Sequence, residues 1–151
     1  MTSQPTHFRH YCQPNPLDQE NFYVASIGND TWRGNSQLLR RGHRYHLLML
    51  TLTGAATGKV NETPIYAEPD SIWLFPRNKT YTYSWNPDVA EWTYYWIEFD
   101  GQWASTLLEM MHLNDQHDFH NCSSSAEIIR NIIQEIISHS HEAQHHASSL
   151  L

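Results

Sequence analysis

One stretch decides the fold of this 151-residue chain: Trp92-Thr93-Tyr94-Tyr95-Trp96-Ile97-Glu98-Phe99. Its side chains alternate in character, and side chains two positions apart on a β-strand share a face. The alternation predicts a strand with Trp92, Tyr94, Trp96 and Glu98 on one face and Thr93, Tyr95, Ile97 and Phe99 on the other. Flat rings tipped with hydroxyl or indole N–H groups suit a core, and they also suit the wall of a pocket for a polar, ring-shaped ligand.

Further strand candidates precede this stretch. Tyr81-Thr82-Tyr83-Ser84-Trp85 repeats the aromatic alternation, and residues 45–53 (YHLLMLTLT) form the strongest candidate, closed by Gly54. Residues 22–27 predict a strand that ends at Gly28-Asn29-Asp30. The other candidates are residues 72–75 and the two sides of a hairpin, residues 57–61 and 65–68. Short strands separated by Gly, Pro and Asn turns predict an antiparallel barrel or sandwich.

The pattern changes period after Asp100-Gly101. Trp103, Leu107, Met110 and Met111 fall at helical spacings, in a helix that should end near residues 112–114. After a polar loop, Ser124-Ser125-Ala126-Glu127 has the form of a capping box for a second helix. Six isoleucines follow as one apolar stripe: Ile128, Ile129, Ile132, Ile133, Ile136 and Ile137. Packing against the β-domain would use part of this stripe, and a dimer surface is an alternative use for the rest.

The chain therefore divides into three parts. Residues 1–21 are polar and carry three prolines, which predicts an arm and argues against a helix. Residues 22–100 predict the β-domain, and residues 101–151 predict a helical region in which residues 142–151 are a candidate for a further helix. Because the sequence ends on two apolar residues, Leu150 and Leu151, we expect it to be part of a longer natural chain.

Composition narrows the functional classes. Nine Lys and Arg residues stand against sixteen Asp and Glu, so the formal charge is −7, and we expect no DNA binding by this chain alone. The absence of a long apolar run or an apolar leader segment predicts a cytoplasmic protein without a membrane partner. Cys12 and Cys122 form no CxxC motif and are predicted to be reduced thiols.

No catalytic or metal-binding constellation stands out. His43 and His46 are three apart, which on one strand places them on opposite faces, so they should not share a metal ion. Glu91 and Glu98 are seven apart, and an unbroken strand would likewise separate the two carboxylates that a glycosidase needs facing each other. His141 and His145 are an i,i+4 pair, for which solvent exposure is the simpler interpretation. We expect no metal, no cofactor and no enzymatic activity.

Three sequence blocks taken together resemble the ligand-sensing domain of the arabinose-regulator (AraC) family of bacterial transcription factors. The blocks are residues 45–54 (YHLLMLTLTG), residues 67–76 (AEPDSIWLFP) and residues 91–101 (EWTYYWIEFDG). The family shows an apolar strand ending in Gly, a turn-strand-turn with a "PGD" and "LFPP" pattern, and a "W-x-Y-x-W-x-x-F" strand. The resemblance covers residues 39–101 well and the following helices by their order only.

This resemblance implies a small cupin-like barrel followed by two α-helices. It also implies an effector, often a sugar, in the barrel, a homodimer through the helices, and DNA binding by a helix-turn-helix domain further along the chain. By position, the implied ligand contacts are Tyr83, Tyr94 and Trp96, with an arginine, Arg40 or Arg41, before the first strong strand. Weaker candidates are a residue near Ala25 or Ser26 and the arm at residues 8–11.

Departures from the family pattern change the expected ligand. Where the arabinose regulator has histidines, this chain has Tyr81, Thr82 and Tyr94. Arabinose is therefore not assumed as the effector, and a metal-dependent cupin is not favoured. Two alternatives remain: a filled aromatic core without a pocket, and a cupin-type sugar isomerase, epimerase or carbohydrate-binding protein. The sequence leaves open which effector binds and whether it activates or represses.

Overall fold

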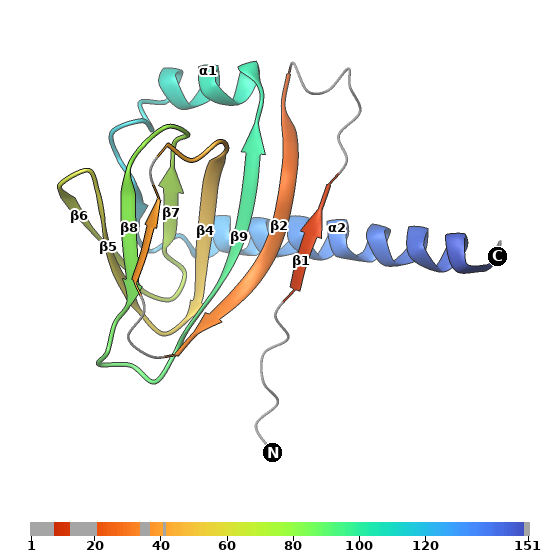
Figure 1. The fold of residues 1–151 in the computed structure, drawn as a ribbon, viewed down its shortest axis with the longest axis horizontal. Coiled ribbons are helices and arrows are strands. Elements are labelled where there is room, and N and C mark those ends of the chain that lie inside the picture. Colours follow the sequence, from red (N-terminus) through yellow and green to blue (C-terminus); the bar gives the residue numbers. More distant parts are fainter. Residues whose placement is uncertain (1–7, 13–20, 34–36, 41, 150–151) are drawn as a thin grey trace.

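The computed structural model describes residues 8–12, 21–33, 37–40 and 42–149, which form two antiparallel β-sheets and two helices (Figure 1). The strands are β1 (Phe8–Tyr11), β2 (Tyr23–Trp32), β3 (Gln37–Arg40), β4 (His46–Thr53), β5 (Ala56–Val60), β6 (Thr63–Ala67), β7 (Ile72–Phe75), β8 (Tyr81–Trp85), β9 (Trp92–Asp100) and β10 (Asp118–Phe119). The helices are α1 (Gln102–Met110) and α2 (Ser123–Ser149). The mainly β fold class with C-terminal helices is confirmed.

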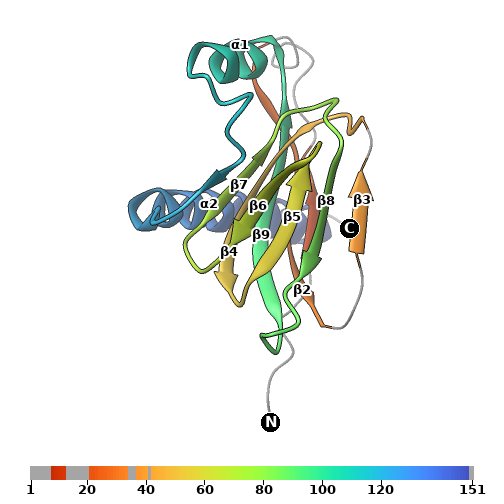
Figure 2. The ribbon, with the colours of Figure 1, turned by 90° about the vertical axis from the view of Figure 1, so that its left-hand side faces the viewer.

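The two sheets face each other and form a cupin-like β-domain (Figure 2). The larger sheet has the strand order β1-β2-β9-β4-β7-β10, and the smaller has the order β3-β8-β5-β6. No strand pairing in the described part of the chain joins one sheet to the other, so the predicted barrel consists of two facing sheets that are not closed. A space between sheets that meet in this way can hold side chains, a ligand or both.

The two faces of the larger sheet carry different kinds of side chain, as the alternation predicts. The inner face meets the smaller sheet through a mainly aromatic cluster, which includes Trp73, Phe75, Tyr81, Tyr83, Trp92, Tyr94 and Trp96. The outer face lies under the helices and is mainly aliphatic, with Ile27, Leu50, Ile72, Leu74, Ile97, Leu108, Ile129 and Ile133. The predicted division of the β9 side chains between two faces is confirmed.

Helix α2 crosses the outer face of the larger sheet (Figure 1). Ile129 and Ile133 are buried against that sheet, whereas Ile128 and Ile132 are 60% and 45% exposed. Asp70 holds the start of the helix, because its carboxylate pairs with Arg130 at 2.8 Å. The stripe is therefore divided between packing and exposure. Within the described residues, neither helix is long and apolar enough to cross a membrane.

The corner between β9 and α1 depends on Gly101. Its φ of 120° lies in a region that L side chains rarely adopt, and a Cβ there would come within 2.2 Å of the Asn21 carbonyl oxygen. That oxygen accepts a hydrogen bond from the backbone N–H of Trp103 at 2.8 Å. The chain can therefore turn from strand to helix while staying close to the segment that precedes β2.

Two strand predictions need correction. The strand predicted for residues 22–27 continues through Gly28-Asn29-Asp30 to Trp32, because these turn-forming residues pair with Trp96, Tyr95 and Tyr94 of β9. A long ladder with β9 thus overrides their local preference for a turn. In the predicted arm, residues 8–11 form β1 and pair with β2 at the edge of the larger sheet.

The helices also differ from their prediction. Helix α2 begins at Ser123, and the Cys122 carbonyl accepts its first hydrogen bond from Ala126, so Ser124 lies inside the helix and is not its cap. The helix then continues to Ser149 without a break before residue 142. Helix α1 has only nine residues, and the polar loop after it contains β10.

The prediction of two free thiols, Cys12 and Cys122, is confirmed.

Candidate functional site

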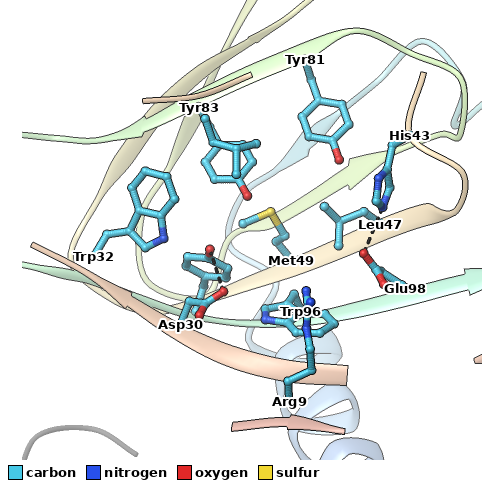
Figure 3. A pocket seen from close by; sticks show the side chains of 12 residues that line it. Arg9, Asp30, Trp32, His43, Leu47, Met49, Tyr81, Tyr83, Trp96 and Glu98 are labelled. Carbon is cyan, nitrogen blue, oxygen red and sulfur yellow. Dashed lines mark hydrogen bonds and ion pairs between the residues drawn. The ribbon is translucent and has the colours of Figure 1, made fainter. Parts of the chain in front are cut away.

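A cavity of about 130 Å³ lies between the two sheets (Figure 3). Strands β1, β2, β3, β4, β8 and β9 contribute to its wall, and His43 comes from the turn before β4. The lining side chains are Arg9, Asp30, Trp32, Leu38, His43, Leu47, Met49, Tyr81, Tyr83, Tyr94, Trp96 and Glu98. The aromatic core thus leaves a space between the sheets, although its rings also pack against one another.

The structure brings three of the five predicted ligand contacts together. Tyr83, Tyr94 and Trp96 all line the cavity and are 5%, 2% and 4% exposed. Arg41 lies outside the described residues, and so does the side chain of Arg40, whose backbone pairs with Tyr81 at the end of β3. The position of the predicted arginine next to the ligand stays a prediction.

The indole of Trp96 presents a polar group that nothing in the described chain satisfies. Its Nε1–H is buried and has no hydrogen-bond partner among the described residues. The Arg9 guanidinium of β1 lies over the same ring, 4.8 Å from its centroid, a distance typical of a cation–π contact. A buried donor without a partner costs about 1–3 kcal/mol, so this indole lowers the stability of the domain.

Asp30 and Tyr94 form one polar end of the cavity. The Tyr94 hydroxyl donates to Asp30 Oδ2 at 3.3 Å. Burial raises the pKa of Tyr94 well above its ordinary value, and the neighbouring Tyr83 and Asp30 raise it further. The phenol therefore stays protonated and remains a hydrogen-bond donor at neutral pH.

Glu98, His43 and Ser26 form the opposite polar end. Glu98 accepts hydrogen bonds from the Ser26 hydroxyl and from His43 Nε2, the latter at 3.0 Å. Burial acts to raise the pKa of Glu98, but hydrogen bonds from His43 and Ser26 and the charge of Arg9 outweigh it, so the pKa is lowered. The side chain is only 16% exposed, and it is nevertheless a carboxylate at neutral pH.

Several lining residues were not predicted as ligand contacts. The alternation in β9 did place Glu98 beside Tyr94 and Trp96, but no partner for it could be read from the sequence. Asp30 and Trp32 were missed because β2 was predicted to end too early. His43 lies in the turn before β4, where the alternation of a strand does not apply, so its inward direction could not be predicted.

The structure confirms that His43 lies apart from His46 and that Glu91 lies apart from Glu98, as predicted. His43 faces the cavity, whereas His46 stacks on Phe99 of the outer cluster with ring centroids 5.3 Å apart. Glu98 lies in the cavity, and Glu91 pairs instead with Arg33 at 2.7 Å on the surface. In the part of the chain that the structure describes, no three His, Cys, Asp or Glu side chains are grouped to hold a metal ion.

Comparison with known proteins identifies the family. The model of the AraC-like ligand-binding domain matches residues 31–151, which is most of the sequence. The chain belongs to this family. The AraC-like chain has no match among curated protein sequences. The matched region begins within β2 and includes every cavity residue except Arg9 and Asp30.

Solved structures agree on the cupin fold of this AraC-like domain. YhaK from Escherichia coli is similar with a TM-score of 0.54 and 12% identity, covering 64% of this chain and 45% of YhaK. The cupin domain of Cnp3 from Schizosaccharomyces pombe has a TM-score of 0.50 and 13% identity, covering 70% of this chain and 69% of that domain. The chain thus spans less than half of YhaK, and at these identities the likeness concerns the fold alone.

Proposed function

We propose that this AraC-like domain binds a sugar or a similar small hydroxylated ring in the cavity between its sheets. The cavity itself, walled by aromatic rings and by the carboxylates of Asp30 and Glu98, is the observation that carries the proposal. We further propose that the bound effector controls DNA binding by another domain of the same cytoplasmic protein, in a homodimer formed through the C-terminal helices.

The size of the cavity supports a ligand of about one ring. A cavity of roughly 150 Å³ is known to accept benzene in another protein, and this one measures about 130 Å³. Its walls combine ring faces, from Trp32, Tyr83 and Trp96, with carboxylates at Asp30 and Glu98. Ring faces can stack on the C–H face of a sugar while carboxylates accept from its hydroxyl groups.

A panel of pentoses and hexoses tests this proposal. A binding sugar should change tryptophan fluorescence and raise the melting temperature, because a ligand that binds only the folded state stabilises it. Trp96→Ala should abolish both effects. Trp103→Ala is the matched control, because Trp103 is 59% exposed on α1 and lies outside the cavity. If no sugar has either effect on the wild type, or if Trp96→Ala binds as well as the control, the sugar proposal is wrong.

The exposed part of the isoleucine stripe supports a dimer. Ile128 and Ile132 are one turn apart on α2, so they form one small apolar surface. Light scattering should show a dimer for the wild type and a monomer for Ile128→Ser/Ile132→Ser. Gln134→Ser, at an exposed polar position on the same helix, should remain a dimer. A monomeric wild type, or a dimeric double variant, would contradict this part of the proposal.

One observation favours a second candidate, a cupin-type sugar isomerase or epimerase. Such an enzyme needs an acid and a base facing its substrate, and His43 and Glu98 both line the cavity. The readout is exchange of a sugar C–H proton for deuterium in D₂O, followed by NMR. The sensor proposal predicts binding without exchange, whereas exchange that is lost in His43→Gln would favour the enzyme.

A further inference from the structure

The charges around the cavity are arranged with the two carboxylates at opposite ends. Figure 3 shows Asp30 on one side of the cavity and Glu98 on the other, with Met49 and Trp96 between them. The strands that carry them are neighbours, since β2 pairs with β9 throughout its length. A molecule that fills the cavity would therefore meet a carboxylate at each end.

Both carboxylates are held by donors within the domain. Glu98 takes one hydrogen bond on each oxygen, from Ser26 and from His43. The Tyr94 hydroxyl donates to one oxygen of Asp30. A carboxylate has about four lone-pair sites, so Glu98, which takes two hydrogen bonds, can accommodate further donors. A ligand with a hydrogen-bond donor facing Glu98 fits this pattern.

Among the described side chains, the cavity wall sets the carboxylates of Asp30 and Glu98 against the guanidinium of Arg9 and the imidazole of His43. Aromatic faces carry the negative end of their quadrupole, and five of the twelve lining residues are Trp or Tyr. The imidazole of His43 is directed at Glu98. Arg9 is exposed, lies over the Trp96 ring and acts on Glu98, whose pKa it lowers, so its charge is already opposed by a protein carboxylate. A ligand carboxylate would thus be desolvated beside two protein carboxylates.

We propose that Glu98 and Asp30 are specificity-determining residues that admit uncharged or cationic one-ring molecules with hydrogen-bond donors and exclude the corresponding acids. The inference rests on the proposed function only in requiring that the cavity take a ligand. It is narrower than that proposal in charge, because a sugar acid is excluded. It is also wider in chemistry, because the selection does not depend on the ligand being a sugar.

Three ring probes of matched shape and different charge test the selection: benzyl alcohol, benzylamine and benzoate. At about pH 7.5 these are neutral, cationic and anionic. Binding is followed by NMR of the chain labelled with fluorotryptophan, in which the Trp32 and Trp96 signals report on the cavity. We expect benzyl alcohol and benzylamine to bind at least about tenfold more tightly than benzoate, because a ligand anion beside a half-buried carboxylate is repelled.

Two variants assign the selection to its residues. Glu98→Gln keeps the shape of the side chain and removes its charge, so benzoate should gain at least threefold relative to benzyl alcohol. Asp30→Asn gives an independent second measurement at the other end of the cavity. Glu91→Gln is the matched control, because Glu91 lies just before β9 and pairs with Arg33 on the surface. It removes the same charge and should leave the ratio of benzoate to benzyl alcohol affinity unchanged. Circular dichroism and melting temperature establish that each variant is folded.

Each outcome bears on the inference separately from the sugar proposal. Equal binding of benzoate and benzyl alcohol to the wild type would overturn the charge selection, even if a sugar binds. An unchanged ratio in both Glu98→Gln and Asp30→Asn would overturn the assignment to these residues. Failure of all three probes to bind would overturn the inference as a whole. Selection against benzoate without binding of any sugar would support the inference and contradict the sugar proposal.

Discussion

The two faces of the larger sheet differ in composition and packing, although the same strands supply the side chains of both. Toward the smaller sheet, β9 presents Trp92, Tyr94 and Trp96, and a cavity remains among these rings. Toward the helices, it presents Ile97 and Phe99 to an aliphatic layer. Aliphatic side chains pack closely without polar atoms, whereas the Tyr hydroxyl and the Trp N–H need hydrogen-bond partners when they are buried.

The outer layer contributes mainly to stability, and the inner layer is the one suited to binding. The outer layer is built mainly from aliphatic side chains, and its burial of apolar surface favours folding, with the buried polar groups His46 and Asp100 at its edge. The inner layer includes the Trp96 indole N–H, which has no partner among the residues that the structure describes, and a carboxylate that is only 16% exposed. A buried donor without a partner lowers stability, whereas the buried carboxylate is stabilised by the hydrogen bonds from Ser26 and His43. Changes in the outer layer should therefore affect folding, and changes in the inner layer should affect binding.

The largest expected effect comes from Leu50→Ala in the outer layer. Leu50 is 0% exposed, and its removal should lower the free energy of unfolding by about 2–5 kcal/mol through lost burial and a new cavity. Leu47→Ala, on the same strand but in the cavity wall, should cost less because space already exists beside it. Urea unfolding measures both. A larger loss for Leu47→Ala would contradict the proposed division between the two faces.

A smaller effect should distinguish two tryptophans within the inner layer. Trp92 Nε1 donates to Thr51 Oγ1 at 3.2 Å, whereas Trp96 Nε1 has no partner among the described residues. Trp92→Phe should therefore cost about 1–2 kcal/mol more in unfolding free energy than Trp96→Phe, because only the first loses a buried hydrogen bond. Equal losses in urea unfolding would show that the Trp96 indole is satisfied.

The alternation in residues 92–99 was sufficient to predict both faces of β9, because burial on two sides of a sheet imposes a period of two. Local sequence was less informative where a tertiary partner decides the outcome. Gly28-Asn29-Asp30 resemble a turn and become strand only because β9 pairs with them. This correction moves Asp30 into the site. Glu98 could be placed on its face, but Ser26 and His43, which hold it, are 72 and 55 residues away.

Acid should weaken the outer layer before the inner one. Burial lowers the pKa of His46 from its ordinary 6.5, and although Asp100 opposes this shift, Arg77 adds to it. Because the folded pKa lies below the unfolded one, the unfolded state binds the proton first. Stability is therefore complete above about pH 6.5 and falls as the pH decreases, by at most about 1.4 kcal/mol per pH unit for one proton.

His46→Asn tests this order. Burial lowers the pKa of His117 as well, so the variant should reduce the slope of unfolding free energy against pH below 6.5 without abolishing it. The lowered pKa of Glu98 affects stability only below its ordinary 4.5, where the carboxylate becomes protonated. Urea unfolding across this range separates the two contributions. An unchanged slope in His46→Asn would show that His46 does not cause the acid sensitivity.

The smallest expected effect compares two carboxylates close together in sequence. Glu91 pairs with Arg33 at 2.7 Å, but their side chains are 35% and 51% exposed, so solvent and salt screen the pair. Glu91→Gln should lower the unfolding free energy by only about 0.2–1 kcal/mol, and less in high salt. Glu98→Gln should lose more and should keep its effect in salt, because Glu98 is held inside the domain by Ser26 and His43. Equal salt dependence of the two variants would mean that Glu98 is as well solvated as Glu91, and the inner face would then lose the buried charge that distinguishes it from the surface.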